Sequence, residues 1–217
     1  MNLIDLKVID FVNEVDSDSP APGGGSVAAL AGSLGASLIR MVGHLTVTKK
    51  KFLALPEANQ CEFRNNIESL LMIKERLITL IDADTASFNQ IMTAFQLPKA
   101  TVEEIEYRNQ TILKATLGAI EVPMEVASLC CDALLNLKSV LSDGNKNALS
   151  DLGVGALMLY SGLEGAILNV EINLSGINDP NKTCYFREKC QKLLTTGTAI
   201  KDNILAKIHS RLLENRN

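Results

Sequence analysis

The chain has 217 residues and a formal net charge of −4, with 47% hydrophobic and 21% charged residues. These values are typical of globular proteins and exclude intrinsic disorder and collagen-like repeats. Aromatic residues make up only 4% and Trp is absent. The core must therefore be aliphatic and rich in alanine, which favours close helix packing and an all-α fold. Because the chain lacks the basic character of nucleic-acid-binding proteins, we expect no nucleic-acid partner.

The cysteines and the first residues indicate the compartment. The five cysteines are odd in number, and the N-terminal segment lacks the basic and apolar regions of a secretory signal. We therefore expect a cytoplasmic protein with reduced thiols. The longest apolar segment runs from Val27 to Leu45, but Arg40 and His44 interrupt it. This pattern predicts a buried helix of a soluble protein and no membrane span.

Two helices are predicted in the first part of the chain. An apolar series with helical spacing predicts a short amphipathic helix before a Pro- and Gly-rich loop at 17–25. Its members are Ile4, Val8, Phe11, Val12 and Val15. Ser26 is a natural N-cap for a second helix, which runs to about Leu45. Small residues along this helix allow other backbones to approach closely, so we expect it at the centre of the fold.

Prolines and capping residues mark the middle helices. A third, very long helix is predicted from Glu57 to Leu97, between two prolines. The Thr-Val-Glu-Glu segment at 101–104 is a capping box that opens a fourth helix. Pro123 is expected to kink or end that helix. A fifth helix from Pro123 should then stop at Gly144, in the left-handed conformation that often ends helices.

The C-terminal part of the chain predicts two more helices. The segment 148–174 carries Gly155, Gly162 and Ala166 on nearly one face, so we expect it to cross the other Gly-bearing helix. Asp179 and Pro180 supply the cap and first turn of the last helix. No segment alternates with the period of two that is typical of strands. The sequence therefore predicts a single-domain helical bundle with long antiparallel helices over residues 1–217.

One carboxylate stands out in the third predicted helix. Asp84 falls three residues after Ile81 and four before Phe88, within the apolar stripe that faces the core. Burying an unpaired Asp is costly, so such a residue is normally paired, neutral or functional. Asp82 lies at the edge of the stripe, about 100° round the helix from Ile81. The pattern leaves two interpretations open: a structural Asp satisfied by a neighbouring helix cap, and a catalytic Asp.

Three consecutive glycines, Gly23, Gly24 and Gly25, precede Ser26 at the start of the second helix. Exposed backbone N–H groups at such a position suit an anion or a polar ligand. A flexible helix entry is the alternative interpretation. No strand precedes the glycines and no GK[ST] follows them, so a dinucleotide fingerprint and a Walker phosphate loop are both rejected.

Two further polar groups are candidates for ligand binding. The run Lys49 to Lys51 either complements the C-terminal dipole of the second helix or captures an anionic substrate tail. A polar cluster opens the Gly-rich segment at 148–174, and helix capping explains it equally well. Its members are Asn145, Asn147, Ser150 and Asp151. The two histidines lie on different helices without zinc-site or Ser-His-Asp spacing, so we expect no metal.

Five motifs, in order along nearly the whole chain, resemble those of one family. They are the glycine-bearing segment 19–30, Asp82-Ala-Asp-Thr85, Leu97-Pro-Lys99, the segment 144–151, and Asn169-Val-x-Ile-Asn-Leu174. The chain is similar to the formimidoyltetrahydrofolate cyclodeaminase family, which is found alone in bacteria and as the C-terminal half of formiminotransferase-cyclodeaminase. This sequence carries no formiminotransferase half, so the resemblance implies only the cyclisation activity.

The resemblance implies a homodimer of helical subunits that binds a reduced folate, with or without a polyglutamate tail. The implied reaction joins N10 of 5-formimidoyltetrahydrofolate to the formimidoyl carbon and releases ammonia, which gives 5,10-methenyltetrahydrofolate. Some bacterial members instead hydrolyse the methenyl ring, as methenyltetrahydrofolate cyclohydrolases, and the sequence does not separate the two activities. Neither reaction needs a cofactor or a metal. A non-catalytic helical scaffold dimer is the more distant alternative.

The resemblance also implies roles for particular residues. In this family the second Asp of the Asp-Ala-Asp motif is the proton acceptor, and it corresponds to Asp84. We take as hypotheses that Asp82 and Asp151 orient or tune Asp84. The segment Gly23 to Ser26 would hold the pterin or its bridge together with Asn145, and Lys49 to Lys51 would meet the glutamate tail. The implied substrate-binding residues are Gly23, Gly24, Gly25, Ser26, Lys49, Lys50, Asn145 and Ser150.

Overall fold

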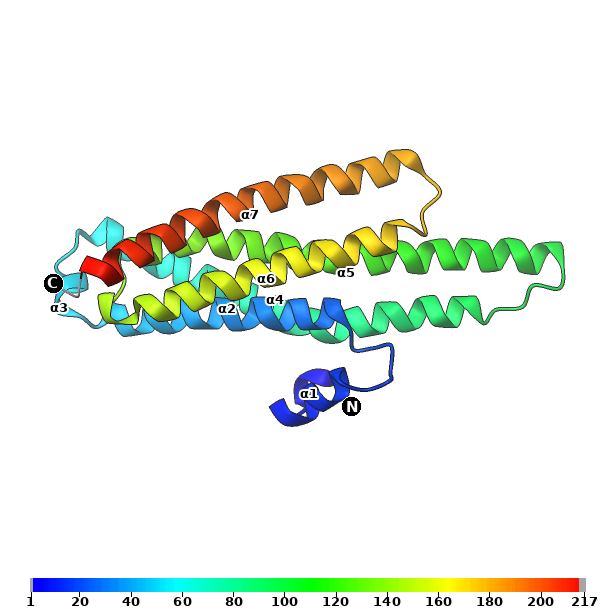
Figure 1. Cartoon of the computed structure of the whole chain (residues 1–217), viewed down its shortest axis with the longest axis horizontal. Coiled ribbons are helices and arrows are strands. Elements are labelled where there is room, and N and C mark those ends of the chain that lie inside the picture. Colours follow the sequence, from blue (N-terminus) through cyan, green and yellow to red (C-terminus); the bar gives the residue numbers. More distant parts are fainter. Residues whose placement is uncertain (1, 215–217) are drawn as a thin grey trace.

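The structure is a computed structural model that describes residues 2–214. All regular secondary structure in this range is helical, which confirms the all-α prediction. Five long helices pack side by side along the bundle (Figure 1). They are α2 (Gly24–Val47), α4 (Glu57–Phe95), α5 (Val102–Asp143), α6 (Leu149–Leu174) and α7 (Pro180–Glu214). That residues 1–217 form a single domain stays a prediction.

The N-terminal segment forms an arm beside the bundle, below α2 in Figure 1. It consists of a 3₁₀ turn, η1 (Leu3–Asp5), and the predicted amphipathic helix, α1 (Val8–Val15). Of the predicted apolar face only Phe11 is buried, while Val8 is 83% exposed and Val12 is 54% exposed. The helix is therefore present as expected, but most of its apolar face has no cover within one subunit.

The start of α2 differs from the prediction. The N-cap is Gly23, and Ser26 lies buried inside the first turn. The assignment of Ser26 as N-cap was wrong because the glycines let the helix begin at Gly24, which leaves the Ser26 side chain directed across to α4. The N-terminal backbone N–H groups of α2 are thus not capped by a side chain of their own helix.

Two of the predicted boundaries in α5 need correction. The helix opens with the expected capping box of Thr101 and Glu104, but it continues through Pro123 to Asp143. A proline inside a helix costs about 3 kcal/mol, and here packing offsets that cost because Pro123 is buried between neighbouring helices. Gly144 ends the helix with φ −66°, not in the left-handed conformation. Glycine is needed there because a Cβ would collide with the Val140 carbonyl oxygen.

The predicted crossing of two Gly-bearing helices, α2 and α6, is confirmed. A Cβ on Gly35 of α2 would lie 2.8 Å from the Gly155 carbonyl oxygen of α6. A Cβ on Gly162 would lie 2.8 Å from the Ala28 carbonyl oxygen. Because residue numbers rise on one helix as they fall on the other, α2 and α6 are antiparallel. Glycine therefore brings the two backbones into direct contact, as an aliphatic core without Trp requires.

The long helix α4 is only partly covered. Its predicted stripe is buried at Leu77 and Ile81, where α2 packs on it. Beyond Asp84 the same stripe becomes open: Phe88 is half-buried, while Met92 is 43% exposed and Phe95 is 51% exposed. The reason is that α2 begins opposite Asp84, so the far end of the α4–α5 hairpin extends beyond it (Figure 1).

Two helical stretches pass a test for membrane spans by length and composition. They are Gly24–Val47 and Lys146–Leu174, with 56% and 50% of their most apolar windows buried inside the bundle. A core helix of a soluble protein passes the same test, so this finding is weak evidence for a span.

The α2–α6 crossing predicts a steric effect that can be measured. In Gly35→Ala the new methyl group would meet backbone atoms of Gly155 and Leu159, so we expect a loss of about 1–3 kcal/mol in unfolding free energy. Gly118→Ala is the matched control, because a Cβ on Gly118 has no atom within 4 Å and Ala is favoured over Gly by about 1 kcal/mol inside a helix. Urea denaturation measures both. Equal stability of the two variants would contradict the direct backbone contact.

Candidate functional site

The candidate site forms where α4 passes the N-terminus of α2. Asp84 of α4 lies against the Cα atom of Gly25, and a Cβ on Gly25 would collide with the Asp84 carboxylate. The hydroxyl of Ser26 lies 3.1 Å from Asp84 Oδ2. The structure therefore brings together three of the predicted site residues, and it explains why the third glycine of the run has no side chain.

Ser26 can serve Asp84 in both of its protonation states. The Ser26 hydroxyl also lies 2.8 Å from the Ile81 carbonyl oxygen and 3.2 Å from Thr85 Oγ1. A hydroxyl has one proton to donate and two lone pairs that accept. Ser26 can therefore donate to an ionised Asp84, or donate to Ile81 and accept the proton of a neutral Asp84. This arrangement suits a carboxyl group that gains and loses a proton.

Electrostatics keep the Asp84 proton available. Burial raises the pKa of the Asp84 carboxyl above its ordinary value, because the charged form loses hydration. Hydrogen bonds from the hydroxyl and the backbone N–H of Ser26 act in the opposite direction and lower the pKa, but burial outweighs them. A carboxyl group with a raised pKa can both accept and return a proton near neutral pH more readily than an exposed Asp.

Asn169 of α6 completes this end of the site and was missed among the predicted site residues. Its amide nitrogen donates to the Gly165 carbonyl oxygen at 2.9 Å. A Cβ on Gly24 would lie 3.0 Å from that same nitrogen, so the Asn169 amide packs directly on the first turn of α2. The available signal was its place as the first residue of the last motif.

Asp82 has a different partner from the one we expected. Its Oδ1 atom accepts the backbone N–H of Leu3 at 2.6 Å, which fastens the N-terminal arm to α4. The pKa of Asp84 is shifted by burial and by hydrogen bonds from Ser26, and Asp82 is not among the causes. The structure therefore gives Asp82 an anchoring contact, and the hypothesis that it tunes Asp84 gains no support.

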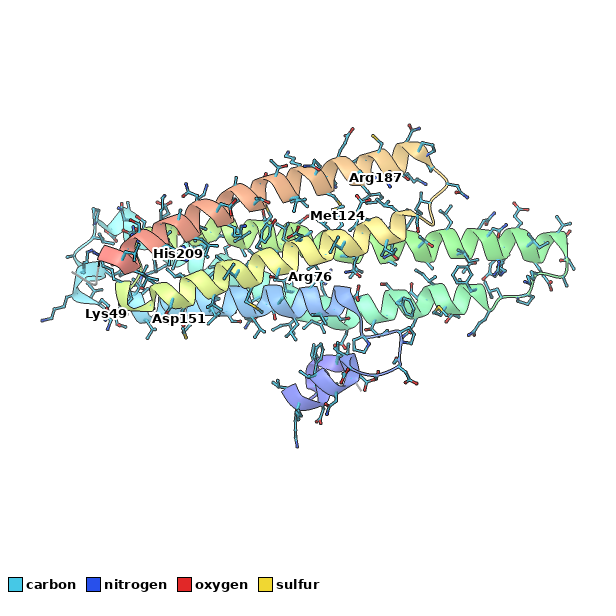
Figure 2. The ribbon with its side chains drawn as sticks, in the orientation of Figure 1. Lys49, Arg76, Met124, Asp151, Arg187 and His209 are labelled. Atoms are coloured by element: carbon cyan, nitrogen blue, oxygen red, sulfur yellow. The ribbon has the colours of Figure 1, made fainter. Side chains whose placement is uncertain are left out.

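The remaining predicted residues lie at the opposite end of α2 and α6. Asp151 is eighteen residues from Asn169 along α6, which corresponds to about 27 Å. Figure 2 shows Asp151 and Lys49 together at that end of the bundle. Asn145 joins them there, because its backbone N–H donates to Thr46 Oγ1 at 2.9 Å. Within one subunit Asp151 does not contact Asp84, so it cannot orient it there.

The lysine end has a small pocket of its own. The pocket has a volume of about 200 Å³ and is lined by Lys49, Lys51 and Lys146 together with Asn145. The Asn145 side chain accepts the Asn147 backbone N–H at 3.1 Å and so caps a 3₁₀ turn, η2 (Lys146–Ala148). Lys50 and Ser150 are exposed nearby. Asp143 also lines the pocket, so this end of the molecule offers several cations beside a half-buried carboxylate.

Comparison with known proteins gives the same family as the motifs. The sequence model of the formiminotransferase-cyclodeaminase family matches residues 7–192 of this chain. This chain belongs to that family. It is 32% identical over 202 residues to the methenyltetrahydrofolate cyclohydrolase of Methylorubrum extorquens, and the match covers 93% of this chain and 95% of the relative.

Two further comparisons agree. The chain is 37% identical over 201 residues to the formimidoyltransferase-cyclodeaminase of Gallus gallus; the match covers 93% of this chain and 36% of that longer protein. The crystal structure of formiminotetrahydrofolate cyclodeaminase from Thermotoga maritima superposes with a TM-score of 0.77 and 25% identity, covering 98% of each chain. The family likeness therefore extends to the helical fold.

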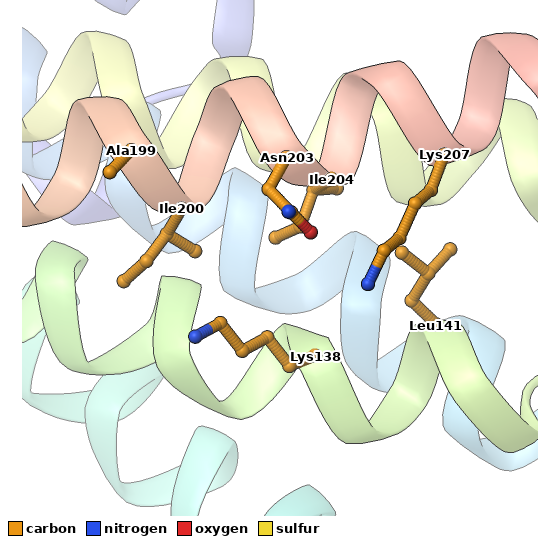
Figure 3. A pocket seen from close by; sticks show the side chains of 7 residues that line it. All are labelled: Lys138, Leu141, Ala199, Ile200, Asn203, Ile204 and Lys207. Atoms are coloured by element: carbon orange, nitrogen blue, oxygen red, sulfur yellow. The ribbon is translucent and has the colours of Figure 1, made fainter.

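A separate groove lies between α5 and α7 (Figure 3), and Asp84 is not among its lining residues. It has a volume of about 380 Å³, and Lys138 and Lys207 approach it from opposite sides with Asn203 between them. Its lining has no carboxylate or thiol. Among residues 2–214 no group of three or more His, Cys, Asp or Glu side chains could hold a metal ion.

The raised pKa of Asp84 predicts how stability depends on pH. A folded-state pKa above the unfolded value favours the neutral carboxyl, so its stabilising effect is full below the unfolded pKa of about 3.9 and is lost as pH rises through the folded pKa. Asp84→Asn has no charge to bury, so its stability should not fall in this way as pH rises. We expect a higher Tm than wild type at pH 7, with the difference shrinking as pH falls towards 4. A lower Tm for Asp84→Asn at pH 7 would contradict the desolvated carboxyl.

Proposed function

We propose that this protein converts 5-formimidoyltetrahydrofolate to 5,10-methenyltetrahydrofolate with release of ammonia. The observation that carries the proposal is the half-buried Asp84 carboxyl, with a raised pKa, held against Gly25 and hydrogen-bonded by Ser26. The membership of the chain in the family, and its full-length match to a cyclodeaminase structure, support the folate substrate.

The first step is attack by N10 of the folate on the carbon of the protonated formimidoyl group. As the new N–C bond forms, N10 must lose a proton, and the Asp84 carboxylate accepts it. Before the transfer, Ser26 stabilises the ionised carboxylate by donating a hydrogen bond from its hydroxyl group. After the transfer it can accept a hydrogen bond from the neutral carboxyl, since its own proton can turn to the Ile81 carbonyl oxygen.

The second step expels ammonia from the tetrahedral carbon. The amino nitrogen takes the proton that Asp84 holds, the C–N bond breaks, and the electron pair leaves with the nitrogen as NH₃. The carbon is left as the methenyl bridge between N5 and N10, and Asp84 returns to its ionised form. The same carboxyl thus acts first as a base and then as an acid. A raised pKa suits both roles, because the group can then accept a proton and return it.

Hydrolysis of 5,10-methenyltetrahydrofolate to the 10-formyl compound is the second candidate function. It is favoured by one comparison, because the relative that this chain covers almost end to end is named a methenyltetrahydrofolate cyclohydrolase. Here Asp84 would accept a proton from the attacking water rather than from N10. Both reactions pass through a tetrahedral carbon with N5 and N10 attached, so one site can serve either.

The surroundings of the reaction complete the proposal. We propose a cytoplasmic enzyme that needs no cofactor, metal, membrane or nucleic acid, with a reduced folate as its substrate and Lys49 and Lys50 directed to a polyglutamate tail. Both lysines are exposed and free to meet carboxylates in solvent. The charge of their ammonium groups suits that anion.

Asp84→Asn tests the proposed base directly. The substitution preserves volume and helical position but removes the proton acceptor, so we expect turnover to fall by about 10²–10⁴ with little change in substrate binding. Wild-type turnover should decline on the acid side through a pKa above the reference Asp value of about 3.9, because Asp84 must be ionised to act as a base. The substituted enzyme should lose that acid limb.

Asp132→Asn is the matched control for that experiment. Partial burial also raises the pKa of the Asp132 carboxyl. This residue lies on α5, its side chain is in the exposed class, and it is not part of the Asp84 site. The turnover of the Asp132→Asn enzyme should equal that of wild type. The assays use 5-formimidoyltetrahydrofolate and 5,10-methenyltetrahydrofolate side by side, which also decides between the two candidate reactions. Wild-type rates in Asp84→Asn on both substrates would refute the proposed role of Asp84.

We also propose that the protein is a homodimer. The observation that supports it is the apolar surface that one subunit leaves open on α1 and α2, including Val8 and Leu34. Light scattering at micromolar concentration should give about twice the 23.5 kDa of one chain. Leu34→Glu, on the exposed side of α2, should shift the protein to a monomer while its helical circular dichroism is kept. A wild-type monomer would overturn the proposal.

A further inference from the structure

The groove between α5 and α7 combines an apolar floor with a cationic rim (Figure 3). We call it the α5–α7 groove. Its volume of about 380 Å³ lies within the range of small-molecule sites, which is about 300–1,000 Å³. The buried side chains at its floor are Leu141, Ile200 and Ile204. The exposed side chains at its rim are Lys138, Asn203 and Lys207.

The charges of the two rim lysines are not neutralised by carboxylates. Between the side chains of residues 2–213, no ion pair includes Lys138 or Lys207. The carboxylate next to the rim in the sequence, Asp202, pairs with Lys201 at 2.7 Å. No carboxylate lines the groove itself. Two like charges therefore face one cavity, and an anion from solution would relieve their repulsion.

The helix α7 adds further positive charge around the groove. It carries seven Lys or Arg against three Asp or Glu, although the whole chain has a net charge of −4. The guanidinium group of Arg211 donates to the Leu141 carbonyl oxygen at 2.6 Å. Because Leu141 lines the groove, a third cation stands at its edge. The α5–α7 groove is thus a local centre of positive charge in an acidic protein.

The α5–α7 groove lies well apart from Asp84 along the bundle. Two contacts show that α5 runs beside α2 in the same direction, since a Cβ added to the glycine of each pair would touch its partner. The pairs are Gly32 with Cys130 and Gly144 with Val42. Lys138 therefore lies level with about residue 38 of α2. Asp84 contacts Gly25, about thirteen residues earlier on α2, so the two sites are about 20 Å apart.

We propose that the α5–α7 groove binds an organic phosphate monoester with a small apolar body, at a site separate from Asp84. A phosphate monoester carries about −1.5 to −2 charge at pH 7 and three strong acceptor oxygens. The two rim ammonium groups match that charge, and the amide of Asn203 supplies a further donor. The apolar floor and the aliphatic stems of the lysines offer a surface to the apolar body. A monocarboxylate would leave one ammonium group without a counter-charge.

Titration calorimetry on the full chain at low salt tests the proposed ligand class. Phenyl phosphate is the probe. Inorganic phosphate lacks the apolar ring, and benzoate has the ring but only one charge. We expect phenyl phosphate to bind about tenfold more tightly than either anion, because each comparison removes one of the two kinds of contact. Equal affinity for inorganic phosphate or for benzoate would overturn the proposed ligand class, and no binding of phenyl phosphate would overturn the site.

Paired substitutions test the place of binding. Lys138→Ala with Lys207→Ala should weaken phenyl phosphate binding by about tenfold or more, because two charge-assisted hydrogen bonds are lost. Lys189→Ala with Lys192→Ala is the matched control. It removes the same charge from exposed positions of the same helix, at least about 22 Å from Lys207, and should bind as wild type does. An equal loss in both variants would show that overall charge attracts the anion, which would overturn the groove as the site.

A third pair of substitutions tests the other cationic pocket of the molecule. Lys49 and Lys51 line the pocket at the end of α2, so Lys49→Ala with Lys51→Ala should leave phenyl phosphate binding unchanged. If this variant lost binding while Lys138→Ala with Lys207→Ala kept it, the anion would belong to that pocket and the proposal would be wrong. Circular dichroism checks that each variant keeps its helical content. No folate is used, so the result is independent of the proposed reaction.

Discussion

The contact between the Asp84 carboxylate and the N-terminus of α2 is the constraint on which the rest of the structure depends. The carboxylate occupies the space where a side chain on Gly25 would stand. Position 25 must therefore be glycine, and the Ser26 hydroxyl turns to α4 instead of capping its own helix. A polar group that would be costly to bury alone is thereby placed among hydrogen-bond partners that fit either protonation state.

The place of α2 itself is set by backbone contact with α6. Gly35 and Gly162 let the two helices approach until main-chain atoms meet, and this direct contact replaces the large aromatic side chains that the chain lacks. The same approach brings Asn169 onto the first turn of α2. Packing by small residues is rigid because a helix that touches backbone cannot shift without collision. A rigid support is what a proton-transfer group requires to keep its geometry.

One subunit nevertheless leaves its apolar surfaces and its charges unmatched. Exposed apolar residues lie on α1, along α2 from Val27 to Leu45, and at the open end of α4, while the lysines stand at the end far from Asp84. The homodimer that we propose would cover the exposed apolar surface of α1 and α2 by a single twofold operation.

The sequence by itself determined the helical class, the ends of most long helices, the Gly-bearing crossing and the special position of Asp84, because each follows from local spacing or from a capping residue next in the chain. It did not determine that α5 continues through Pro123, because packing between helices outweighs the local cost of proline. The sequence also did not predict that Ser26 bonds to Asp84 across helices or that Asp82 binds the N-terminal arm. Nor did it predict that Asp151 lies far from Asp84. These contacts depend on which helices meet and in which direction they run. Only the tertiary structure decided these contacts, since they join residues far apart in the chain.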